Sequence, residues 1–469
     1  MTRPLAAFCA GAVLSLAAAT AAPAGTPGGW TSIVAGANAP SASQELGLAR
    51  TPDGRLNVAW SSDLAAVHAA SITAAGQVGS PTTTVSGWSL GGDPTLVTEG
   101  GGLRLFFGSV IPVYGLLTFT AASSAGPWTG PGVVETADFA YGRTPGVTRT
   151  SDGSLIETWY SAADIVVHRG LSPGGGVTIS SGGTNTRPDT ITDASGNVFV
   201  AWCEFGGGAQ GVLVRRIDPA SASPIGSQMQ LPGSTTQASN GTQASCVLES
   251  EVSRREPIVA RHGGGVFVAG TSGYPSLSRV LVWRLDSSGN VASTSVVANA
   301  KNVSYSEPGL AAAPDGRIWV AWLEPAGAGK RIVARRSNPS GTVFGAPVRR
   351  AAPDGGGVGN FNLSAQNDRV DVVAILSGTG GTSLQHTQLL PGLTLVRTKL
   401  VRRGRGTAAV TFRVLDAGDP VAGARVRAGG RSGATAANGT ATLVLRRGGA
   451  ATASKAGYVA ASIRFGCCR

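Results

Sequence analysis

The chain has 469 residues, with 38 Lys and Arg against 26 Asp and Glu, a formal net charge of +12 and 69 glycines. This length exceeds what one compact core normally holds, so we expect more than one domain. The high glycine content, together with only 14% charged residues, favours many short strands and tight turns and argues against an intrinsically disordered chain.

The first residues predict an export signal over residues 1–24. Arg3 supplies a small positive region, residues 5–19 form an apolar run, and the small residues at 22–24 fit a cleavage site. The apolar run is too short to span a bilayer, and no later segment reaches the required length. We therefore expect a secreted or cell-surface protein without a transmembrane segment.

A pattern that recurs seven times predicts the architecture of residues 25–396. Each copy has a turn that ends in glycine, followed by an alternating apolar run that closes on Ala-Trp or an equivalent pair. The copies end at Trp60, Phe107, Trp159, Trp202, Gly270, Trp322 and Ile375. Repeats of about 40–50 residues with several strands each are typical of β-propellers.

The sequence thus predicts an all-β chain that begins with a seven-bladed β-propeller. Six blades are the alternative, if the weakest copy, at residues 368–377, merges with N-terminal strand residues. We expect the segment from Trp30 to Val34 to complete the last blade and close the ring, because closure removes exposed strand edges. The long polar insertion at residues 219–253 is expected to be a surface loop.

The cysteines suggest one disulfide. Cys203 directly follows a repeat's Ala-Trp, and Cys246 lies in the polar insertion. In an exported chain we favour a bridge between these two residues. For the adjacent Cys467 and Cys468, a vicinal bridge, an intermolecular bridge and free thiols all remain open. The sequence has no cysteine or histidine cluster with zinc spacing, so we expect no metal and no cofactor.

A polar residue precedes the proline at the start of each repeat, or its equivalent by spacing. The series is Glu45, Asp93, Thr144, Arg187, Glu256, Glu307 and Asn360. If the strand that follows is innermost, these side chains form a ring at one mouth of the central channel, which is the usual ligand site of a propeller. Carboxylates in such a ring can catalyse glycoside hydrolysis at suitable separations. The alternative is that the prolines start strands and the polar residues stand in solvent.

Two of these segments carry a family resemblance. The stretches Tyr-Gly-Arg-Thr-Pro at 141–145 and Arg-Glu-Pro at 255–257 are similar to the Arg-x-Pro strand of the sialidase-like (BNR-repeat) superfamily. The resemblance implies a propeller in which an arginine grips a sugar carboxylate, and it makes Arg143, Arg255 and Glu256 the catalytic candidates. The chain lacks the family's Asp box, and no motif matches its Tyr–Glu nucleophile pair, which favours a non-catalytic protein.

The pattern changes at residue 397. Strand runs alternate with turn signals at residues 418–420 and 438–439, as in a small β-sandwich, which we expect over residues 397–469. The stretches Asn-Gly-Thr-Ala-Thr-Leu at 438–443 and Lys-Ala-Gly-Tyr at 455–458 resemble carboxypeptidase-regulatory-like and bacterial immunoglobulin-like modules. This resemblance implies a non-catalytic spacer or attachment domain.

The net charge of the chain belongs to this C-terminal segment, which holds fourteen basic and two acidic residues. A basic domain on an exported protein can bind anionic envelope polymers. The candidates are Arg402, Arg403, Arg405, Arg425, Arg427, Arg446 and Arg447. Export and the lack of interleaved aromatic residues argue against nucleic acid as the target. The alternative is a solvated arginine-rich surface that reflects composition bias.

These observations favour an exported, non-catalytic ligand-binding or adhesion protein. The propeller would recognise a glycan or a protein, and the basic domain would attach the chain to anionic envelope material. The first alternative is a sialidase-like glycoside hydrolase, and the second is a structural scaffold. Convergence of Arg143, Arg187 and Arg255 in one pocket beside a glutamate and a tyrosine would favour the enzyme.

Overall fold

The computed structural model describes residues 28–136, 144–206, 210–238, 241–248, 255–273, 276–404 and 406–467. These residues form strands, turns and the short 3-10 helices η1 (Gly36–Asn38), η2 (Ser245–Leu248) and η3 (Pro353–Gly355). Within the described ranges there is no α-helix, and no helix has the length and apolar character that a membrane crossing requires. The chain is therefore all-β, as the glycine content and the strand periodicity predicted.

The first three sheets follow one another along the chain. Sheet 1 contains β2 (Gly47–Arg50), β3 (Leu56–Ser62), β4 (Ala66–Ile72) and β5 (Thr82–Ser86). Sheet 2 contains β6 (Ser89–Leu90), β7 (Thr95–Glu99), β8 (Gly102–Ile111), β9 (Gly115–Ala121) and β10 (Thr129–Glu135). Sheet 3 contains β11 (Gly146–Arg149), β12 (Leu155–Ser161), β13 (Asp164–Arg169) and β14 (Val177–Thr178).

The next sheets repeat this antiparallel plan. Sheet 4 contains β15 (Thr184–Thr192), β16 (Val198–Phe205), β17 (Gly211–Ile217) and β18 (Pro224–Gln230). Sheet 5 contains β21 (Ile258–Ala260), β22 (Val266–Ser272), β23 (Arg279–Leu285) and β24 (Val291–Asn299). Sheet 6 contains β25 (Ser306–Ala312), β26 (Ile318–Ala326), β27 (Gly329–Arg336) and β28 (Val348–Arg350). Sheet 7 contains β29 (Gly357–Ala365), β30 (Val370–Gly378), β31 (Gly381–Leu389) and the N-terminal β1 (Thr31–Ala35).

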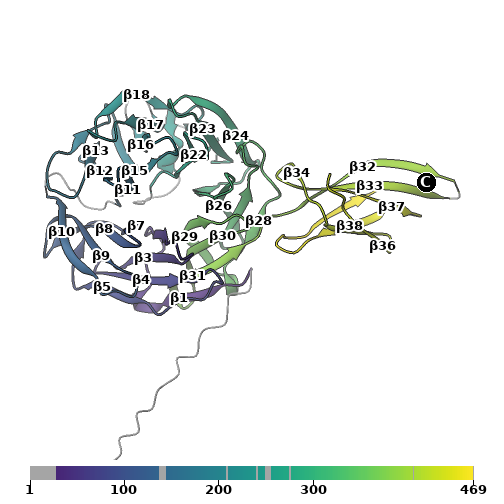
Figure 1. Cartoon of the computed structure of the whole chain (residues 1–469), viewed down its shortest axis with the longest axis horizontal. Helices are drawn as coiled ribbons and strands as arrows, with labels where there is room; N and C mark the ends of the chain where they lie inside the picture. The colour runs from purple at the N-terminus through teal and green to yellow at the C-terminus, as the bar shows by residue number, and fades with distance from the viewer. Residues whose placement is uncertain are drawn as a thin grey trace, which may run out of the picture.

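The sheets surround a common axis, as in a β-propeller (Figure 1). The innermost strands contact one another in a closed cycle, which runs β2, β7, β11, β15, β21, β25, β29 and back to β2. The ring closes through sheet 7, because β1 pairs antiparallel with β31 and so joins the N-terminal segment to the last repeat. The expected role of the Trp30–Val34 segment therefore agrees with the strand pairing.

The recurring sequence pattern is explained by the second strand of each sheet. Every residue of β3 is buried, because this strand lies between two other strands and is covered on both faces by neighbouring sheets. The recurring tryptophans Trp60, Trp159 and Trp202 are all 1% exposed or less. The glycine before the strand ends a turn with a left-handed backbone: φ is +83° at Gly54 and +86° at Gly153. Glycine adopts this conformation without the steric cost of a Cβ atom.

The polar insertion is more ordered than a surface loop. Residues 224–230 form β18, the outer strand of sheet 4, and β19 (Thr235–Ala238) pairs with β20 (Gly241–Ala244) in a small hairpin. The helix η2 then brings Cys246 into a core that it shares with Cys203, and a disulfide joins the two residues. The composition of the insertion did not predict these strands, because the contacts that stabilise them come from sheets 4 and 5.

The C-terminal domain packs two sheets on one core. One contains β32 (Thr394–Arg403), β33 (Thr407–Asp416), β34 (Asp419–Pro420) and β37 (Thr440–Leu445). The other contains β35 (Arg425–Ala428), β36 (Arg431–Ala434), β38 (Gly449–Ser454) and β39 (Ala461–Phe465). Phe412 and Phe465 meet edge to face inside, with ring centroids 5.2 Å apart. Leu393 and Leu395 already belong to this core, so the domain begins a few residues before the expected position 397.

Ion pairs join the two domains where the C-terminal sheets meet sheet 6 (Figure 1). Arg336 donates to Asp416, both are buried, and the Arg336 guanidinium lies 5.8 Å from the centre of the Tyr458 ring. Arg317 Nη2 donates to Asp419 Oδ2 over 2.6 Å. Asp416 and Asp419 are the only acidic residues after position 396, so this junction uses both of them.

Candidate functional site

The polar ring that the sequence predicted is buried. Its seven members lie shortly before or within the innermost strands, and each is at most 9% exposed. They are Glu45, Asp93, Thr144, Arg187, Glu256, Glu307 and Asn360. The alternative, in which polar residues stand in solvent before each strand, is therefore wrong. A polar group that is removed from water needs a partner, so what these residues contact decides whether they could bind a ligand.

Arg255 connects the ring across the axis. It lies just before sheet 5, yet its backbone N–H and its Nε each donate over 2.8 Å to the two carboxylate oxygens of Glu45, which precedes sheet 1. Its Nη1 also donates to Thr95 Oγ1 in sheet 2 at 3.3 Å and lies 3.9 Å from Asp189 Oδ1 in sheet 4. One guanidinium thus ties four sheets together at the centre, where a ligand would otherwise enter.

Four further ring members, Asp93, Arg187, Glu256 and Asn360, also contact other protein groups. Asp93 accepts from the backbone N–H of Glu45 at 2.8 Å and from Ser61 Oγ at 2.6 Å. Arg187 Nε lies 3.4 Å from Glu256 Oε1, and the same guanidinium donates to the carbonyl of Cys246. Asn360 Nδ2 donates to the carbonyl of Gln44 at 2.9 Å. These contacts link neighbouring sheets, so the ring acts as a set of inter-sheet fastenings.

Two ring positions have a strained backbone. Arg187 has φ +60° and Glu307 has φ +52°, a left-handed conformation that non-glycine residues rarely adopt. Each such residue costs about 1–3 kcal/mol and persists only where the surrounding contacts hold it. Sequence reasoning gave no signal for this, because both positions hold residues with a Cβ atom.

A small cavity lies beside the Arg255 guanidinium. Its volume is about 60 Å³, and Glu45, Asp189 and Asn362 contribute its polar lining. Burial raises the pKa of Asp189 to about 7, with Glu45 also raising it and Arg255 opposing both. The Asp189 carboxyl therefore changes charge near neutral pH. The cavity holds about one or two water molecules, which is too little for a sugar ring.

Of the three catalytic candidates, the structure describes Arg255 and Glu256. Arg143 lies outside the described residues. Arg255 and Glu256 are adjacent, but Arg255 pairs with Glu45 and Glu256 pairs with Arg187. In this arrangement both arginines neutralise carboxylates of the protein itself.

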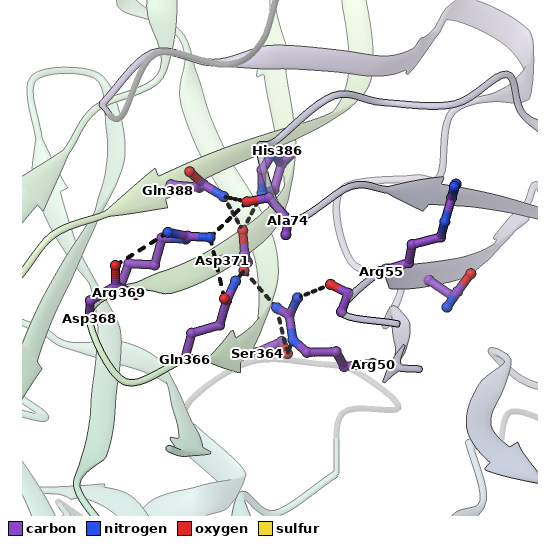
Figure 2. A network of polar contacts seen from close by, with 12 residues as sticks. Arg50, Arg55, Ala74, Ser364, Gln366, Asp368, Arg369, Asp371, His386 and Gln388 are labelled. Atoms are coloured by element: carbon purple, nitrogen blue, oxygen red, sulfur yellow. Dashed lines mark hydrogen bonds and ion pairs between the residues drawn. The ribbon is translucent and has the colours of Figure 1, made fainter. Parts of the chain in front are cut away.

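Two histidines at equivalent positions of their repeats, His168 and His386, form buried pairs with acids. Figure 2 shows the most extensive of these networks, in which Asp371 on β30 accepts from His386 and Gln388 on β31 and from Arg50 on β2. The three distances are 2.9, 2.9 and 2.6 Å. Although burial opposes ionisation, these partners lower the pKa of Asp371 to about 2. Asp371 is therefore ionised and paired with Arg50 between sheets 7 and 1.

The equivalent pair in sheet 3 contains Glu157 and His168. Nδ1 of His168 lies 3.2 Å from Glu157 Oε2, and both side chains are buried. The contact with Glu157 raises the pKa of His168 although burial opposes it, and burial raises the pKa of Glu157. His68 instead contacts Ser62 Oγ at 2.9 Å, and burial lowers its pKa. Each histidine therefore has a packing role inside its own sheet.

The basic candidates of the C-terminal domain occupy two surfaces. Arg402, Arg446 and Arg447 line a groove of about 800 Å³. Arg425 and Arg427 lie on the outer face of the sheet that contains β35. Arg403 is exposed at the end of β32, and Arg405 lies outside the described residues. In the described ranges no ion pair involves the three groove arginines.

Sequence reasoning missed two further basic residues near this groove. Arg397 is part of its lining, and Arg464 lines an adjoining depression of about 520 Å³ with Phe465. Arg397 also donates through Nη1 to the carbonyl of Gly466 at 2.7 Å, which holds the end of β39 against β32. The charge excess of residues 397–469 identified the C-terminal domain as the basic one. Which arginines share a surface depends on the pairing of β32 with β33, which the sequence pattern does not give.

Comparisons with known proteins give only general likeness. No protein-family model and no curated protein matches the chain. Among solved structures, the polysaccharide lyase Uly1 matches at 10% identity and a TM-score of 0.43, covering 76% of this chain and 91% of that one. A GH43_1 enzyme from Xanthomonas citri complexed with xylotriose matches at 12% identity and a TM-score of 0.36, covering 81% and 92%. A thermostable family-43 glycoside hydrolase matches at 10% identity and a TM-score of 0.34, covering 67% and 90%. At these scores function has to be argued from the residues of this chain.

Proposed function

We propose that this chain is an exported binding protein, in which a seven-bladed propeller is carried by an immunoglobulin-like domain that attaches to an anionic polymer. The blade count is supported by the closed cycle of innermost strands. Export is inferred from the sequence of residues 1–24 and from the Cys203–Cys246 disulfide, since disulfides persist in oxidising compartments.

One observation carries the attachment function, namely the separation of charge within the C-terminal domain. Its two carboxylates, Asp416 and Asp419, both pair with propeller arginines at the junction. The rest of the domain is left with cationic side chains and no internal carboxylate to neutralise them. Such a surface attracts polyanions, and the attraction weakens as salt screens it.

The experiment is binding of the full chain to an immobilised acidic polymer, compared with a neutral polymer of the same backbone. We expect retention on the acidic polymer at low ionic strength and stepwise release as salt rises. Absence of retention at low ionic strength would refute the attachment function.

A carbohydrate-active enzyme is the second candidate. It is favoured by Asp189, whose pKa of about 7 suits a general acid. Glu45 supplies a second carboxylate in the lining of the same cavity. The size of the cavity and the engagement of Arg255 argue against it. Incubation with a panel of fluorogenic glycosides and soluble polysaccharides decides the question, because the binding function predicts no turnover.

A further inference from the structure

The groove at the far end of the C-terminal domain has a structural origin in β32. The pairing of β32 with β33 shifts register between Arg397 and Lys399, which marks a β-bulge. An extra residue reverses which side chains face the neighbouring sheet, because successive side chains of a strand point to opposite faces. The bulge therefore decides which residues of β32 face the space between the two sheets.

Beyond the bulge, the side of β32 that faces the core carries Leu400 and Arg402. They lie opposite Val410 and Ala408, which are fully buried core residues. Directly opposed residues in an antiparallel pair point to the same face. Arg402 therefore projects from the core face of an edge strand, at a place where the second sheet does not cover it.

The other lining residues come from the connection between the two sheets and from the second sheet. Arg446 and Arg447 lie in the connection between β37 and β38, and Phe465 ends β39. Arg397 joins β32 to this part of the lining through its bond to Gly466. The lining of the groove thus combines the apolar side chains of Leu400 and Phe465 with the guanidinium groups of four arginines.

We infer that this groove is the binding site for one extended chain of an acidic polysaccharide, an inference that rests on the proposed attachment function. A guanidinium group pairs with carboxylate or sulfate through two parallel hydrogen bonds, and the described lining residues include no carboxylate that would compete. A pocket lined by arginines suits a single polymer chain, whereas proteins that lie on a membrane surface typically bury the apolar face of an amphipathic helix.

Single-stranded nucleic acid fits this groove less well. Proteins that bind it present exposed aromatic rings on which bases stack. The aromatic residue in the lining is Phe465, which is 9% exposed and packs against Phe412. The groove therefore offers charge and apolar side chains, and it lacks a stacking platform.

The test compares two charge-matched variants of the full chain. Arg402→Gln with Arg446→Gln removes two charges from the groove, and Arg425→Gln with Arg427→Gln removes two charges from the outer face of β35. The probes are polygalacturonate, which carries carboxylates, and dextran sulfate, which carries sulfates, with neutral dextran as the blank. All substituted residues are exposed, and thermal unfolding verifies that both variants fold.

We expect the groove variant to bind at least one acidic probe about tenfold more weakly than the unmodified chain, and the face variant less than about threefold more weakly. Equal losses in the two variants would overturn the groove assignment and leave the attachment function standing. No binding by the unmodified chain would overturn both. Single-stranded DNA that binds more tightly than either acidic polysaccharide, with the same dependence on the groove, would overturn the assigned class of polymer.

Discussion

Arg255 donates from Nε to Glu45 Oε1 over 2.8 Å, although the two residues are 210 positions apart in the sequence. Both lie at the axis, and the same guanidinium also faces Asp189. The sequence pattern assigns these polar residues to ligand binding. In the structure, the contact instead holds sheets together. Its energetic weight is open to direct measurement.

Arg255→Met is expected to lower the free energy of unfolding by about 3–5 kcal/mol. The substitution leaves the Glu45 carboxylate buried without its cation, and an uncompensated buried charge is strongly destabilising. Urea unfolding followed by tryptophan fluorescence measures the change. Arg55→Met is the control, because Arg55 pairs with Asp53 in solvent and its loss should leave the urea midpoint unchanged. Similar midpoints for the two variants would show that Arg255 is not a central fastening.

Asp189 is expected to make the folded chain less stable as pH rises. Its pKa is about 7 in the folded protein against an ordinary 3.8, so the folded state disfavours the ionised carboxylate. The cost of ionising Asp189 in the folded state therefore lowers the free energy of unfolding. This loss is absent below about pH 4 and grows until about pH 7. Asp189→Asn should therefore gain stability over the unmodified chain across this range. A difference in unfolding free energy that stays constant between pH 4 and pH 8 would contradict the raised pKa.

Asp371 should show the opposite pH dependence. Its pKa of about 2 lies below the ordinary 3.8, so the ionised carboxylate stabilises the folded state above about pH 4. This contribution is lost as pH falls towards 2. Asp371→Asn is expected to cost about 3 kcal/mol at neutral pH, since it leaves Arg50 without its ion-pair partner, and less in acid. Unfolding curves of both proteins at several pH values measure the convergence.

The junction between the domains can be tested with its two acids. Asp416→Asn removes the buried partner of Arg336 and is expected to cost about 3 kcal/mol, because Arg336 then remains charged inside the interface. Asp419→Asn is the control, since its side chain is 45% exposed and its pair with Arg317 should contribute less than about 1 kcal/mol. Small-angle scattering should show a wider range of interdomain orientations for the first variant only. A rigid Asp416→Asn chain would mean that backbone contacts alone fix the junction.

Local patterns in the sequence were sufficient for the strands and the turns. The Ala-Trp runs and the glycine turns located the buried second strands, because strand periodicity and positive φ are local requirements. The pairing of Arg255 with Glu45 was not predictable in this way, since it depends on which residues the closed ring brings to the axis. The same holds for Arg402, whose direction depends on a bulge that appears only once β32 is aligned with β33.

The polar insertion at residues 219–253 is a second case in which local sequence patterns did not predict the structure. Its serine- and threonine-rich composition is typical of a surface loop, yet Cys246 is 1% exposed and bonded to Cys203. The cysteine positions pointed to this bridge, whereas the composition of the surrounding residues pointed away from any ordered structure. The Cys203–Cys246 disulfide and the core that these residues share order this segment, although its local sequence has little preference for strands.

The pairing of β1 with β31 places the two ends of the ring in one sheet, with Thr31 opposite His386. Closing this sheet requires a contact between segments that almost the whole propeller separates, so it carries a large loop-closure entropy and slows folding. Until then β31 presents an unpaired edge to other chains. The first strand thus covers the edge of β31, and a chain that lacked it would leave that edge open to neighbouring chains.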